Sequence, residues 1–406
     1  MSETAKIRGG IRRLSLSCHE DAARELARIG VDPAGMARMI PKLDSMHLLI
    51  PSVRPPAANI LKQEMLSIGG DAAVARGTVA CSIESTDVLL IGNRSQLERL
   101  CCKLEYQPFG LKSLSSSIRA QLDLPGQRQA FWCFRNGRLS LERPLVMGIL
   151  NITPDSFSDG GRFINCSDAV EHALEMIDEG ADIIDIGGES TRPGASGIPE
   201  EEELRRVLPV IEAIAGRSAI PLSIDTWKSG VARAAIDSGA SIVNDISALS
   251  FDPGMVSVIA ESNAGAVLMH TRGRPQTMQN DIGYRDLMGE VAESLENSAD
   301  LAISNGVKRE SIVIDPGIGF GKDMRGNLEL LRRLGELTSL GYPLLVGTSR
   351  KSFIGRALGR ENPDERLFGT AATVAIAVAN GASIIRVHDV RAMRDVADMA
   401  VSVTEP

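Results

Sequence analysis

The amino-acid sequence predicts an α/β protein, with a (β/α)8 TIM barrel preceded by a small α/β (or α+β) N-terminal domain and a β-hairpin. At 406 residues the chain is long for a single domain. From residue 144 onward, eight short apolar segments alternate with amphipathic helical patterns over about 260 residues, the usual size of such a barrel. Polar residues of the kind that bind ligands follow almost every apolar segment. We therefore expect an N-terminal domain at 1–128, a linker and hairpin at 129–143, and the barrel at 144–406.

Composition and charge narrow the range of partners. The net charge of −8 argues against nucleic acid, which usually selects a basic surface. The longest apolar run, at 371–379, is about half the length that a bilayer-spanning helix needs, so no membrane partner is expected. The first residues contain no apolar signal segment, and the six cysteines show no CxxC spacing. Reduced thiols in a cytoplasmic protein fit this pattern best.

The N-terminal domain is expected to be a small layered fold. Its helices are predicted at 19–29, 56–68 and 95–104, the last capped by Asn93, and its strands at 47–50, 78–83 and 87–91. The last two strands are expected to pair. We find no metal-binding spacing, phosphate loop or catalytic constellation here, so the sequence does not reveal the role of this domain.

A β-hairpin is expected to join the two domains. Residues 130–134 and 139–141 flank the dipeptide Asn136-Gly137, the strongest short signal for a hairpin turn. We expect the hairpin to cover the bottom of the barrel as a plug.

The apolar runs of the barrel indicate where its strands end. These ends are Leu150, Ile186, Ile224, Asp245, Met269, Ile314, Gly347 and Val387. Helices are expected at 168–179, 201–214, 228–238, 286–304, 327–334, 364–379 and 391–401. An open doubly wound sheet is the rival architecture. It would usually show a glycine-rich turn after its first strand, and none is present.

Two groups of polar residues stand at these strand ends, where barrels of this kind place their active sites. Asp225, Asn244 and Asp315 offer carboxylate and amide groups that suit a flat heterocycle with NH donors, such as a guanine or pterin edge. Asn151, Arg386 and His388 follow strands 1 and 8, which are neighbours only if the barrel closes. Amide, guanidinium and imidazole together suit a phosphate or diphosphate, with Mg²⁺ as a further ligand. Lys351 could reach both groups.

Each signal also has a purely structural interpretation. Asp225 could cap the next helix, Asp315-Pro-Gly could be only a turn, and Arg386 and His388 could pair with Asp389 or with carboxylates of the last helix. The glutamates at 200–203 fit a solvated helix start. The segment 317–322 is similar to a phosphate loop, but Pro316 and Asp323 break that pattern.

Seven segments resemble, in order, the signature segments of dihydropteroate synthases. They are 148–161, 188–195, 223–228, 244–245, 315–322, 347–353 and 386–389. The runs 151–157 and 347–353 are long enough to make the resemblance specific. It covers about residues 140–406 and leaves the first 130 or so outside. Such an enzyme is a transferase that joins 4-aminobenzoate to 6-hydroxymethyl-7,8-dihydropterin diphosphate and releases diphosphate.

The resemblance also implies residue roles, a cofactor and an assembly. The pterin would be held by Asp225, Asn244, Met269, Asp315 and Lys351, and the diphosphate by Asn151, Thr191, Arg386 and His388, with Asn151 also binding Mg²⁺. The aminobenzoate would be framed by Arg192, Pro193, Phe320, Lys351 and Ser352. Asp225, Lys351, Arg386 and His388 would be the catalytic residues. Members of the family are expected to form homodimers through outer helices, and the loops after strands 1 and 2 are candidates for mobile lids.

One segment departs from the family pattern. After strand 5 the chain has His270-Thr271-Arg272-Gly-Arg-Pro where a Gly-Thr-Pro-like turn is common. This change is expected to bring the guanidinium of Arg272 to the pterin side of the mouth.

Two other functions compete with the synthase. A methyltransferase acting on methyltetrahydrofolate would keep the pterin group but leave 347–353 and 386–388 unexplained. A non-catalytic pterin-binding module would bind ligand without turnover, which an activity measurement would reveal.

Overall fold

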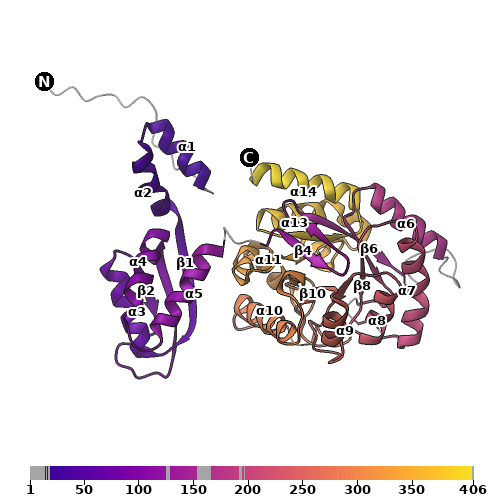
Figure 1. Ribbon diagram of the computed structural model, residues 1–406, viewed down its shortest axis with the longest axis horizontal. Helices are drawn as coiled ribbons and strands as arrows, with labels where there is room; N and C mark the ends of the chain where they lie inside the picture. Colours follow the sequence, from indigo (N-terminus) through magenta and orange to yellow (C-terminus); the bar gives the residue numbers. More distant parts are fainter. Residues whose placement is uncertain are drawn as a thin grey trace. The chain divides into compact units, whose positions relative to one another are not determined.

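The computed structural model describes Leu14, Leu16 and residues 19–124, 129–152, 166–191, 194–195, 197–280 and 282–404. The chain divides into two compact units, Met1–Gly126 and Gln127–Pro406. The N-terminal unit is drawn in indigo and violet in Figure 1, and the hairpin belongs to the C-terminal unit. No helix in the described ranges is long and apolar enough to cross a bilayer.

The N-terminal unit is a three-stranded antiparallel sheet of order β1-β3-β2 with helices packed on it. Its elements are α1 (His19–Ile29), α2 (Pro33–Leu43), β1 (Ser45–Val53), α3 (Pro55–Ser67), β2 (Asp71–Val74), β3 (Thr86–Asn93), α4 (Arg94–Leu104) and α5 (Leu111–Asp123). Asn93 caps α4 as predicted, because its side chain accepts from Gln96 N at 3.0 Å and Gln96 Oε1 accepts from Asn93 N at 2.8 Å.

The predicted strand at 78–83 is wrong. This stretch forms turns, in which Thr78 bonds back to Ala75 O through its hydroxyl at 2.7 Å and its amide at 3.2 Å. The apolar alternation that suggested a strand leaves Val79 81% exposed. The strand that pairs with β3 is instead β2, with Ala72 facing the core.

Eight parallel strands form the barrel of the C-terminal unit, and helices surround them (Figure 1). The strands are β6 (Leu145–Asn151), β7 (Ile183–Gly187), β8 (Leu222–Asp225), β9 (Ile242–Asp245), β10 (Gly265–Met269), β11 (Ile312–Asp315), β12 (Leu345–Val346) and β13 (Ile384–Val387). Every strand ends within one residue of its predicted end. The ring is closed by the pairing of β13 with β6 and by a bridge between Ile314 and Leu344. The predicted (β/α)8 architecture is therefore confirmed, and strand 8 does lie beside strand 1.

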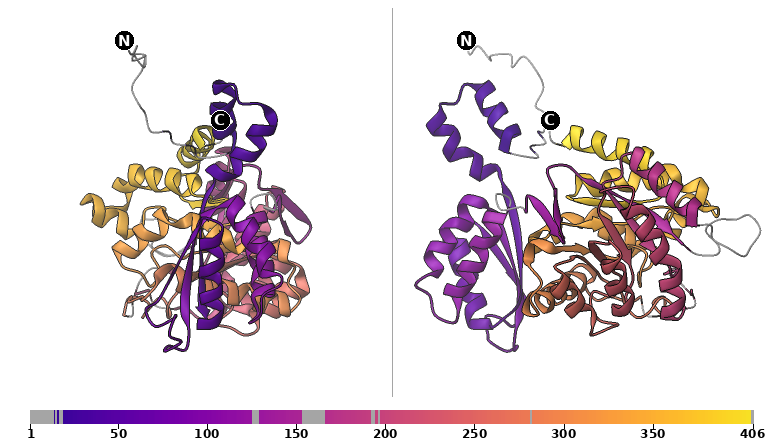
Figure 2. Two further views of the ribbon diagram at one scale, coloured as in Figure 1. Left: turned by 90° about the vertical axis from the view of Figure 1, so that its left-hand side faces the viewer. Right: turned by 45° about the vertical axis from the view of Figure 1, so that its right-hand side comes forward.

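The outer helices match most of the predicted positions. They are α6 (Cys166–Asp178), α7 (Glu200–Ala215), α8 (Ser229–Asp237), α9 (Met255–Ser262), α10 (Leu287–Ser304), α11 (Met324–Arg332), α12 (Ser352–Leu358), α13 (Leu367–Ala379) and α14 (Val390–Thr404). Short 3₁₀ turns at Arg309–Ser311, Leu334–Leu340 and Pro363–Arg366 precede β11, β12 and α13. Helices α9 and α12 had no predicted counterpart. Figure 2 shows the same ring of helices from two further sides.

The hairpin of β4 (Phe131–Phe134) and β5 (Gly137–Ser140) plugs the barrel bottom, as predicted. Trp132 is fully buried against the first inward residues of the strands, among them Met147, Ile183 and Val313. Its indole Nε1 donates to Ser311 O at 2.9 Å, so its one polar atom is satisfied.

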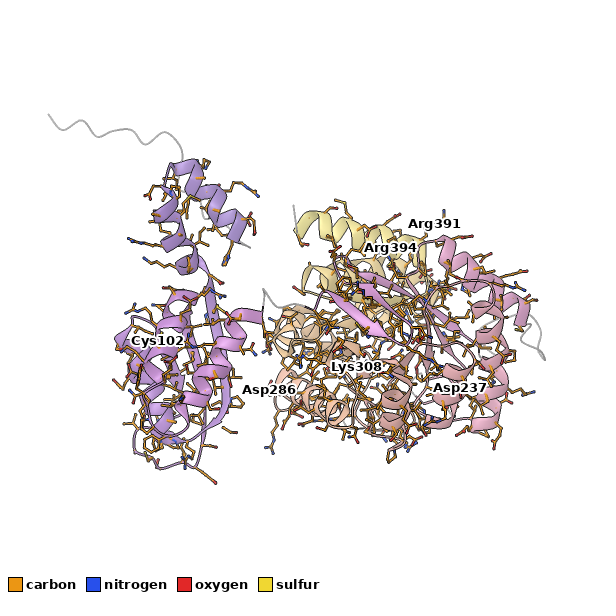
Figure 3. All side chains as sticks on the ribbon, viewed as in Figure 1. Cys102, Asp237, Asp286, Lys308, Arg391 and Arg394 are labelled. Atoms are coloured by element: carbon orange, nitrogen blue, oxygen red, sulfur yellow. The ribbon has the colours of Figure 1, made fainter. Side chains whose placement is uncertain are left out.

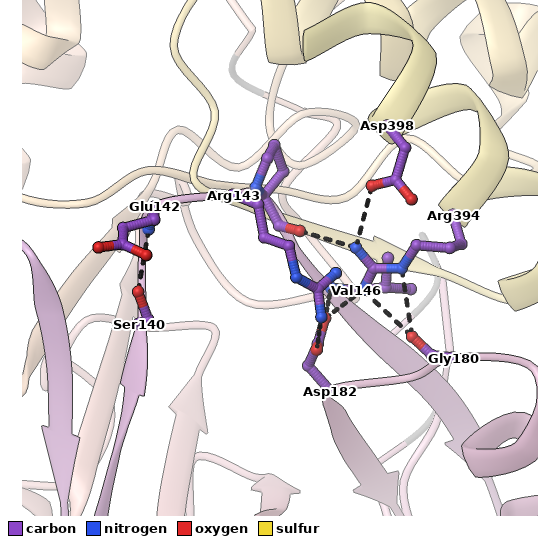
Figure 4. Close-up of polar contacts among 9 residues, drawn as sticks. Ser140, Glu142, Arg143, Val146, Gly180, Asp182, Arg394 and Asp398 are labelled. Atoms are coloured by element: carbon purple, nitrogen blue, oxygen red, sulfur yellow. Dashed lines mark hydrogen bonds and ion pairs between the residues drawn. The ribbon is translucent and has the colours of Figure 1, made fainter. Parts of the chain in front are cut away.

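The last helix is bonded to the segments that precede the first two barrel strands (Figure 4). Arg394 of α14 donates to Pro144 O at 2.9 Å and to Gly180 O at 3.1 Å, and it forms an ion pair with Asp182. Asp182 also accepts from Arg143 at 2.8 Å. Figure 3 shows Arg394 and Arg391 on this helix. One mostly buried arginine thus joins the segments that lead into β6 and β7 to the end of the chain.

Candidate active site

The side chains that line the mouth of the barrel are selected by the two-residue alternation of its strands. Every second side chain points into the barrel, and the deepest inward layer packs on Trp132. On five of the strands, the next inward position carries a residue predicted for the site or bound to one. For β7, β9, β10, β11 and β13, the deep and upper residues are Ile183 and Asp185, Ile242 and Asn244, Val267 and Met269, Val313 and Asp315, and Ile384 and Arg386. Buried apolar residues therefore hold a polar layer directly above them.

Four of the five residues predicted to hold the pterin, Asp225, Asn244, Met269 and Asp315, come together in this layer. Asp225 pairs in register with Asn244, and Met269 pairs with Asp315. Each of the four is at most 6% exposed. Asp225 does not cap α8, because that helix begins after Lys228 without a side-chain cap. Asp315 does support its own turn, since Oδ1 accepts from Gly317 N at 2.7 Å.

Arg386 lies with these carboxylates rather than in a separate anion group. Its Nε donates to Asp185 Oδ2 and its Nη2 to Asp225 Oδ2, both at 2.6 Å. Asn244 Nδ2 donates to the same Asp185 oxygen at 3.0 Å. The proposed pairing of Arg386 with Asp389 is wrong, because Asp389 is bound by Arg350 at 2.7 and 3.1 Å. Residue 386 shares its inward parity with Ile384, and this directs the guanidinium across the barrel.

Burial sets the electrostatics of the mouth. It raises the pKa of Asp225 to about 7, although Arg386 opposes that shift and Asp185 adds to it. It also raises the pKa of Asp315, against the influence of Lys351. The Oδ1 atoms of Asp185 and Asp225 are buried and find no hydrogen-bond partner in the described part of the chain. This layer thus contains two acceptor atoms that are unpaired in the described ranges.

Lys351 meets the loop after β11. Its Nζ donates to Ile318 O and lies 4.7 Å from the centre of the Phe320 ring. Burial lowers the pKa of Lys351 to about 8, while Asp315 opposes the shift. Among the predicted aminobenzoate residues, Phe320 and Lys351 are therefore together, and Ser352 is exposed at the start of α12. Arg192 and Pro193 lie outside the described residues, and Thr191 is half-buried just before them.

A cavity of about 650 Å³ lies beside the ends of β6 and β13. Asn151, Arg350, His388 and Asp389 line it, and it extends outward to residues of α6 and α14 such as His172, Arg391 and Asp395. His388 Nδ1 lies 2.9 Å from Ser349 Oγ. Asn151 and His388 thus border one cavity, whereas the guanidinium of Arg386 binds Asp185 and Asp225.

Several buried polar residues escaped the sequence reasoning. Asp185 was not among the residues assigned to the site. Lys322 is 3% exposed, and its Nζ donates to Gly317 O at 3.0 Å and Phe320 O at 2.9 Å and lies 2.9 Å from His270 Nδ1. Burial lowers the pKa of Lys322 to about 7, and burial with the Lys322 charge lowers that of His270 to about 3. No pattern in the sequence could show that this lysine binds carbonyl groups of its own loop.

Two expectations near the mouth need correction. Arg272 is not directed at the pterin side. It forms an ion pair with Glu290 of α10, and its guanidinium carbon lies 3.9 Å from the centre of the Tyr284 ring. The glutamates that open α7 are not all solvated, because Glu203 is fully buried. Both side chains found partners on elements that are distant in sequence.

Comparison with known proteins identifies the family. The sequence profile described as pterin binding enzyme matches residues 147–388. Dihydropteroate synthase of Synechocystis sp. is 52% identical over 259 residues, which cover 64% of this chain and 90% of that protein. The chain belongs to the dihydropteroate synthase family. The solved structure of Xanthomonas albilineans dihydropteroate synthase with 4-aminobenzoic acid agrees at a TM-score of 0.63 and 44% identity, covering 70% of this chain and 98% of that one. The resemblance carried by the strand-end motifs is confirmed, as is the expected enzyme class, a transferase.

The N-terminal unit of this family member also occurs elsewhere. A probable bifunctional folylpolyglutamate synthase/dihydropteroate synthase of Haloferax volcanii is 41% identical over 381 residues. That match covers 91% of this chain and 45% of that protein. It must include most of the N-terminal unit, because the C-terminal unit begins only at Gln127. The same two units therefore stand together in a second protein.

Proposed function

We propose that the chain condenses 6-hydroxymethyl-7,8-dihydropterin diphosphate with 4-aminobenzoate to give 7,8-dihydropteroate and diphosphate. The observation that carries the proposal is the single buried layer in which Asp225, Asn244 and Asp315 meet Lys351 and Arg386. Acceptors and cations converge there in a chain of which 259 residues are 52% identical to a dihydropteroate synthase. A heterocycle with NH donors and a polyanionic leaving group needs both kinds of group at one mouth.

The pterin ring would occupy the space bordered by Asp225, Asn244, Met269 and Asp315. The unpartnered Oδ1 of Asp225 is an acceptor for a ring NH or NH₂ group. Met269 offers a flexible apolar surface for the ring face, and the charges of both Asp225 and Asp315 act on the Lys351 ammonium. Phe320, beneath Lys351, would frame the aminobenzoate together with Ser352, Arg192 and Pro193.

The diphosphate would lie between Arg386 and the side of the mouth formed by Asn151, Thr191 and His388. The guanidinium has five N–H groups, and the bonds to Asp185 and Asp225 use two of them. Its remaining donors can bind phosphate oxygens while those carboxylates keep it in place.

The residues present suit Mg²⁺ as a cofactor that binds together with the diphosphate. No group of three His, Cys, Asp or Glu side chains converges among the described residues. Mg²⁺ is commonly held by one or two protein oxygens, substrate phosphates and water, so a dense protein cage is not needed. The half-buried side chain of Asn151 makes no hydrogen bond to another described residue, and Asn151 and His388 line the same cavity. When bound, Mg²⁺ would neutralise charge on the diphosphate.

The chain would act mainly on the leaving group. As the C–O bond breaks, negative charge grows on the diphosphate, and Arg386, Lys351 and His388 would stabilise it. The dihydropterin methylene carbon becomes positive, and the carboxylate of Asp225 would stabilise that cation. The arylamine then attacks the carbon and loses its proton afterwards. We assign no general base to this step.

We also propose a homodimer built through outer helices. The face of α13 presents the stripe Phe368, Ala372, Ile376 and Ala379, with Phe368 84% and Ile376 47% exposed. Apolar residues at intervals of three and four on an outer helix suit a helix-to-helix contact. A reducing compartment such as the cytoplasm is consistent with the free thiol of Cys102, which is exposed in the N-terminal unit (Figure 3).

The decisive measurement is diphosphate release from dihydropterin diphosphate and Mg²⁺, with and without 4-aminobenzoate. We expect release to require aminobenzoate and to fall by about a hundredfold or more in Arg386→Ala. Arg233→Ala is the matched control, because Arg233 pairs only with exposed Glu261 in the described structure and lies on the outer helix α8. Pterin binding without any release would refute the synthase and favour a binding module or a methyltransferase.

A further inference from the structure

A buried lysine outside the ligand layer joins three separate parts of the barrel top. Lys228, between β8 and α8, is 8% exposed, and its Nζ donates to Glu189 Oε2 at 2.7 Å, Glu203 Oε2 at 2.6 Å and Ile198 O at 2.7 Å. An ammonium has three N–H groups, and all three are used. Lys228 also follows Asp225 by only three residues, so it extends from the strand end that carries the proposed pterin carboxylate.

The partners of Lys228 mark both ends of one loop. Glu189 is two residues beyond the end of β7, and Ile198 is two residues before α7, whose first turn contains Glu203. A further contact fixes the start of the loop, because Arg206 of α7 donates to Gly188 O at 2.9 Å. A Cβ on Gly188 would lie 2.8 Å from a methyl of Val207, so the chain runs tightly along α7 at this point.

The loop that is held in this way carries Thr191, two residues after Glu189. Its middle touches another loop, where Gly194 N donates to Pro275 O at 3.0 Å. The lysine and its partners therefore set where the loop leaves β7 and where it returns.

We infer that Lys228 is a positioning residue, which fixes the loop after β7 so that Thr191 can contact the diphosphate of the pterin substrate. This inference rests on the proposed function, since the diphosphate role of Thr191 belongs to it. The hydrogen-bond partners of Lys228 Nζ in the described structure, Glu189, Ile198 and Glu203, lie outside the ligand layer.

The charge of the cluster supports a role in geometry rather than in stability alone. Two carboxyl groups share one ammonium, and Glu203 is fully buried with its Oε1 lacking a partner in the described structure. A buried ion pair with an unsatisfied oxygen stabilises a fold poorly, and apolar residues of the same volume often do as well. An apolar cluster would lack the directed hydrogen bonds that Lys228 Nζ makes to Glu189 and to Ile198 O.

The test compares two ligands that differ only in the diphosphate. Binding of 6-hydroxymethyl-7,8-dihydropterin and of its diphosphate ester, the latter with Mg²⁺, is measured by calorimetry for wild type, Lys228→Met and Lys228→Arg. In Lys228→Met we expect the Kd of the diphosphate ester to rise by about tenfold or more, the effect of one lost hydrogen bond to a charged group. The Kd of the pterin without diphosphate should change by less than about twofold, because Asp225 and Asn244 keep their places. Lys228→Arg should recover part of the loss, and Arg233→Met should change neither value.

The outcomes separate the inference from the proposed function. If wild type does not bind the diphosphate ester more tightly than the plain pterin, the proposed diphosphate site fails. If wild type shows that preference and Lys228→Met weakens both ligands equally, or neither, the lysine is merely structural and the inference is wrong. If Lys228→Met does not fold, Glu189→Gln decides, because it keeps the side-chain shape while weakening one bond of the cluster. An unchanged ratio of the two Kd values in that variant would also refute the inference.

Discussion

Removing the guanidinium of Arg386 should destabilise the barrel in a pH-dependent way. In Arg386→Met the apolar stem is largely kept, but Asp185 and Asp225 lose the cation that lies 2.6 Å from each. Both carboxylates are buried, with side-chain exposures of 0% and 7%. Breaking a buried pair by deleting one partner costs about 3–5 kcal/mol, because a charge is left without compensation.

The size of the loss should depend on the ionisation of Asp225. Its pKa in the folded protein is raised to about 7, so below pH 7 it is protonated with or without Arg386. Above pH 7 the wild-type carboxyl ionises, while the carboxyl in the variant, with a still higher pKa, stays protonated. The free energy of unfolding of the variant, relative to that of wild type, then decreases by about 1.4 kcal/mol for each pH unit above 7. We therefore expect a loss of about 3–5 kcal/mol at pH 8.5 and about 2 kcal/mol less at pH 6.

Urea unfolding followed by tryptophan fluorescence can measure this loss. The only two tryptophans, Trp132 and Trp227, both lie in the C-terminal unit, so the signal reports on the barrel alone. Arg233→Met serves as the control, since its ion pair has side chains 52% and 63% exposed and should contribute less than about 1 kcal/mol. A loss that is equal at pH 6 and pH 8.5, or below about 1 kcal/mol at both, would contradict the reasoning.

Two further predictions concern the plug and the pterin site. Trp132→Ala should cost the barrel about 3–5 kcal/mol in urea unfolding followed by circular dichroism, because a fully buried indole and its bond to Ser311 O are lost. Phe131→Ala, at a site 37% exposed on the same strand, should cost clearly less, and equal losses would mean that Trp132 is no plug. Affinity for 6-hydroxymethyl-7,8-dihydropterin should fall by up to about tenfold per pH unit below pH 7, because Asp225 then carries a proton and loses acceptor strength. A Kd that is constant from pH 5.5 to pH 8, or that keeps its pH dependence in Asp225→Asn, would rule out this role.

The barrel could be predicted closely from sequence because its strands are buried on both faces. An uninterrupted apolar run such as the one in β6 has few alternative environments, and its end is marked by the first polar residue, Asn151. The N-terminal unit was harder to predict from sequence, because its sheet has one exposed face and its strands and helices are marked only by local turn and capping residues. Helix α2 (Pro33–Leu43) contains Gly35 and Pro41, both poor helix formers, yet it forms behind the N-cap Asp32, whose side chain accepts from Gly35 N at 3.0 Å.

The chemistry of the mouth was predictable by residue type but not by partner. Period-two alternation places Arg386 on the inner side of β13, but only the closed ring shows that it reaches Asp185 and Asp225 across the barrel. The burial of Glu203 has a similar cause. Its position at the start of α7 is typical of a solvated acid, and its partner Lys228 lies 25 residues further along the chain.

The hairpin plug determines where the barrel can be separated from the N-terminal unit. Because the hairpin from Phe131 to Ser140 closes the bottom of the barrel, it is part of the same folded unit, although it precedes the first barrel strand. The Xanthomonas albilineans structure matches 70% of this chain, about the share that the barrel and hairpin occupy together. A junction between the two units that lies before the hairpin keeps the bottom of the barrel closed. The N-terminal unit can therefore be gained or lost between relatives without opening the core of the barrel to water.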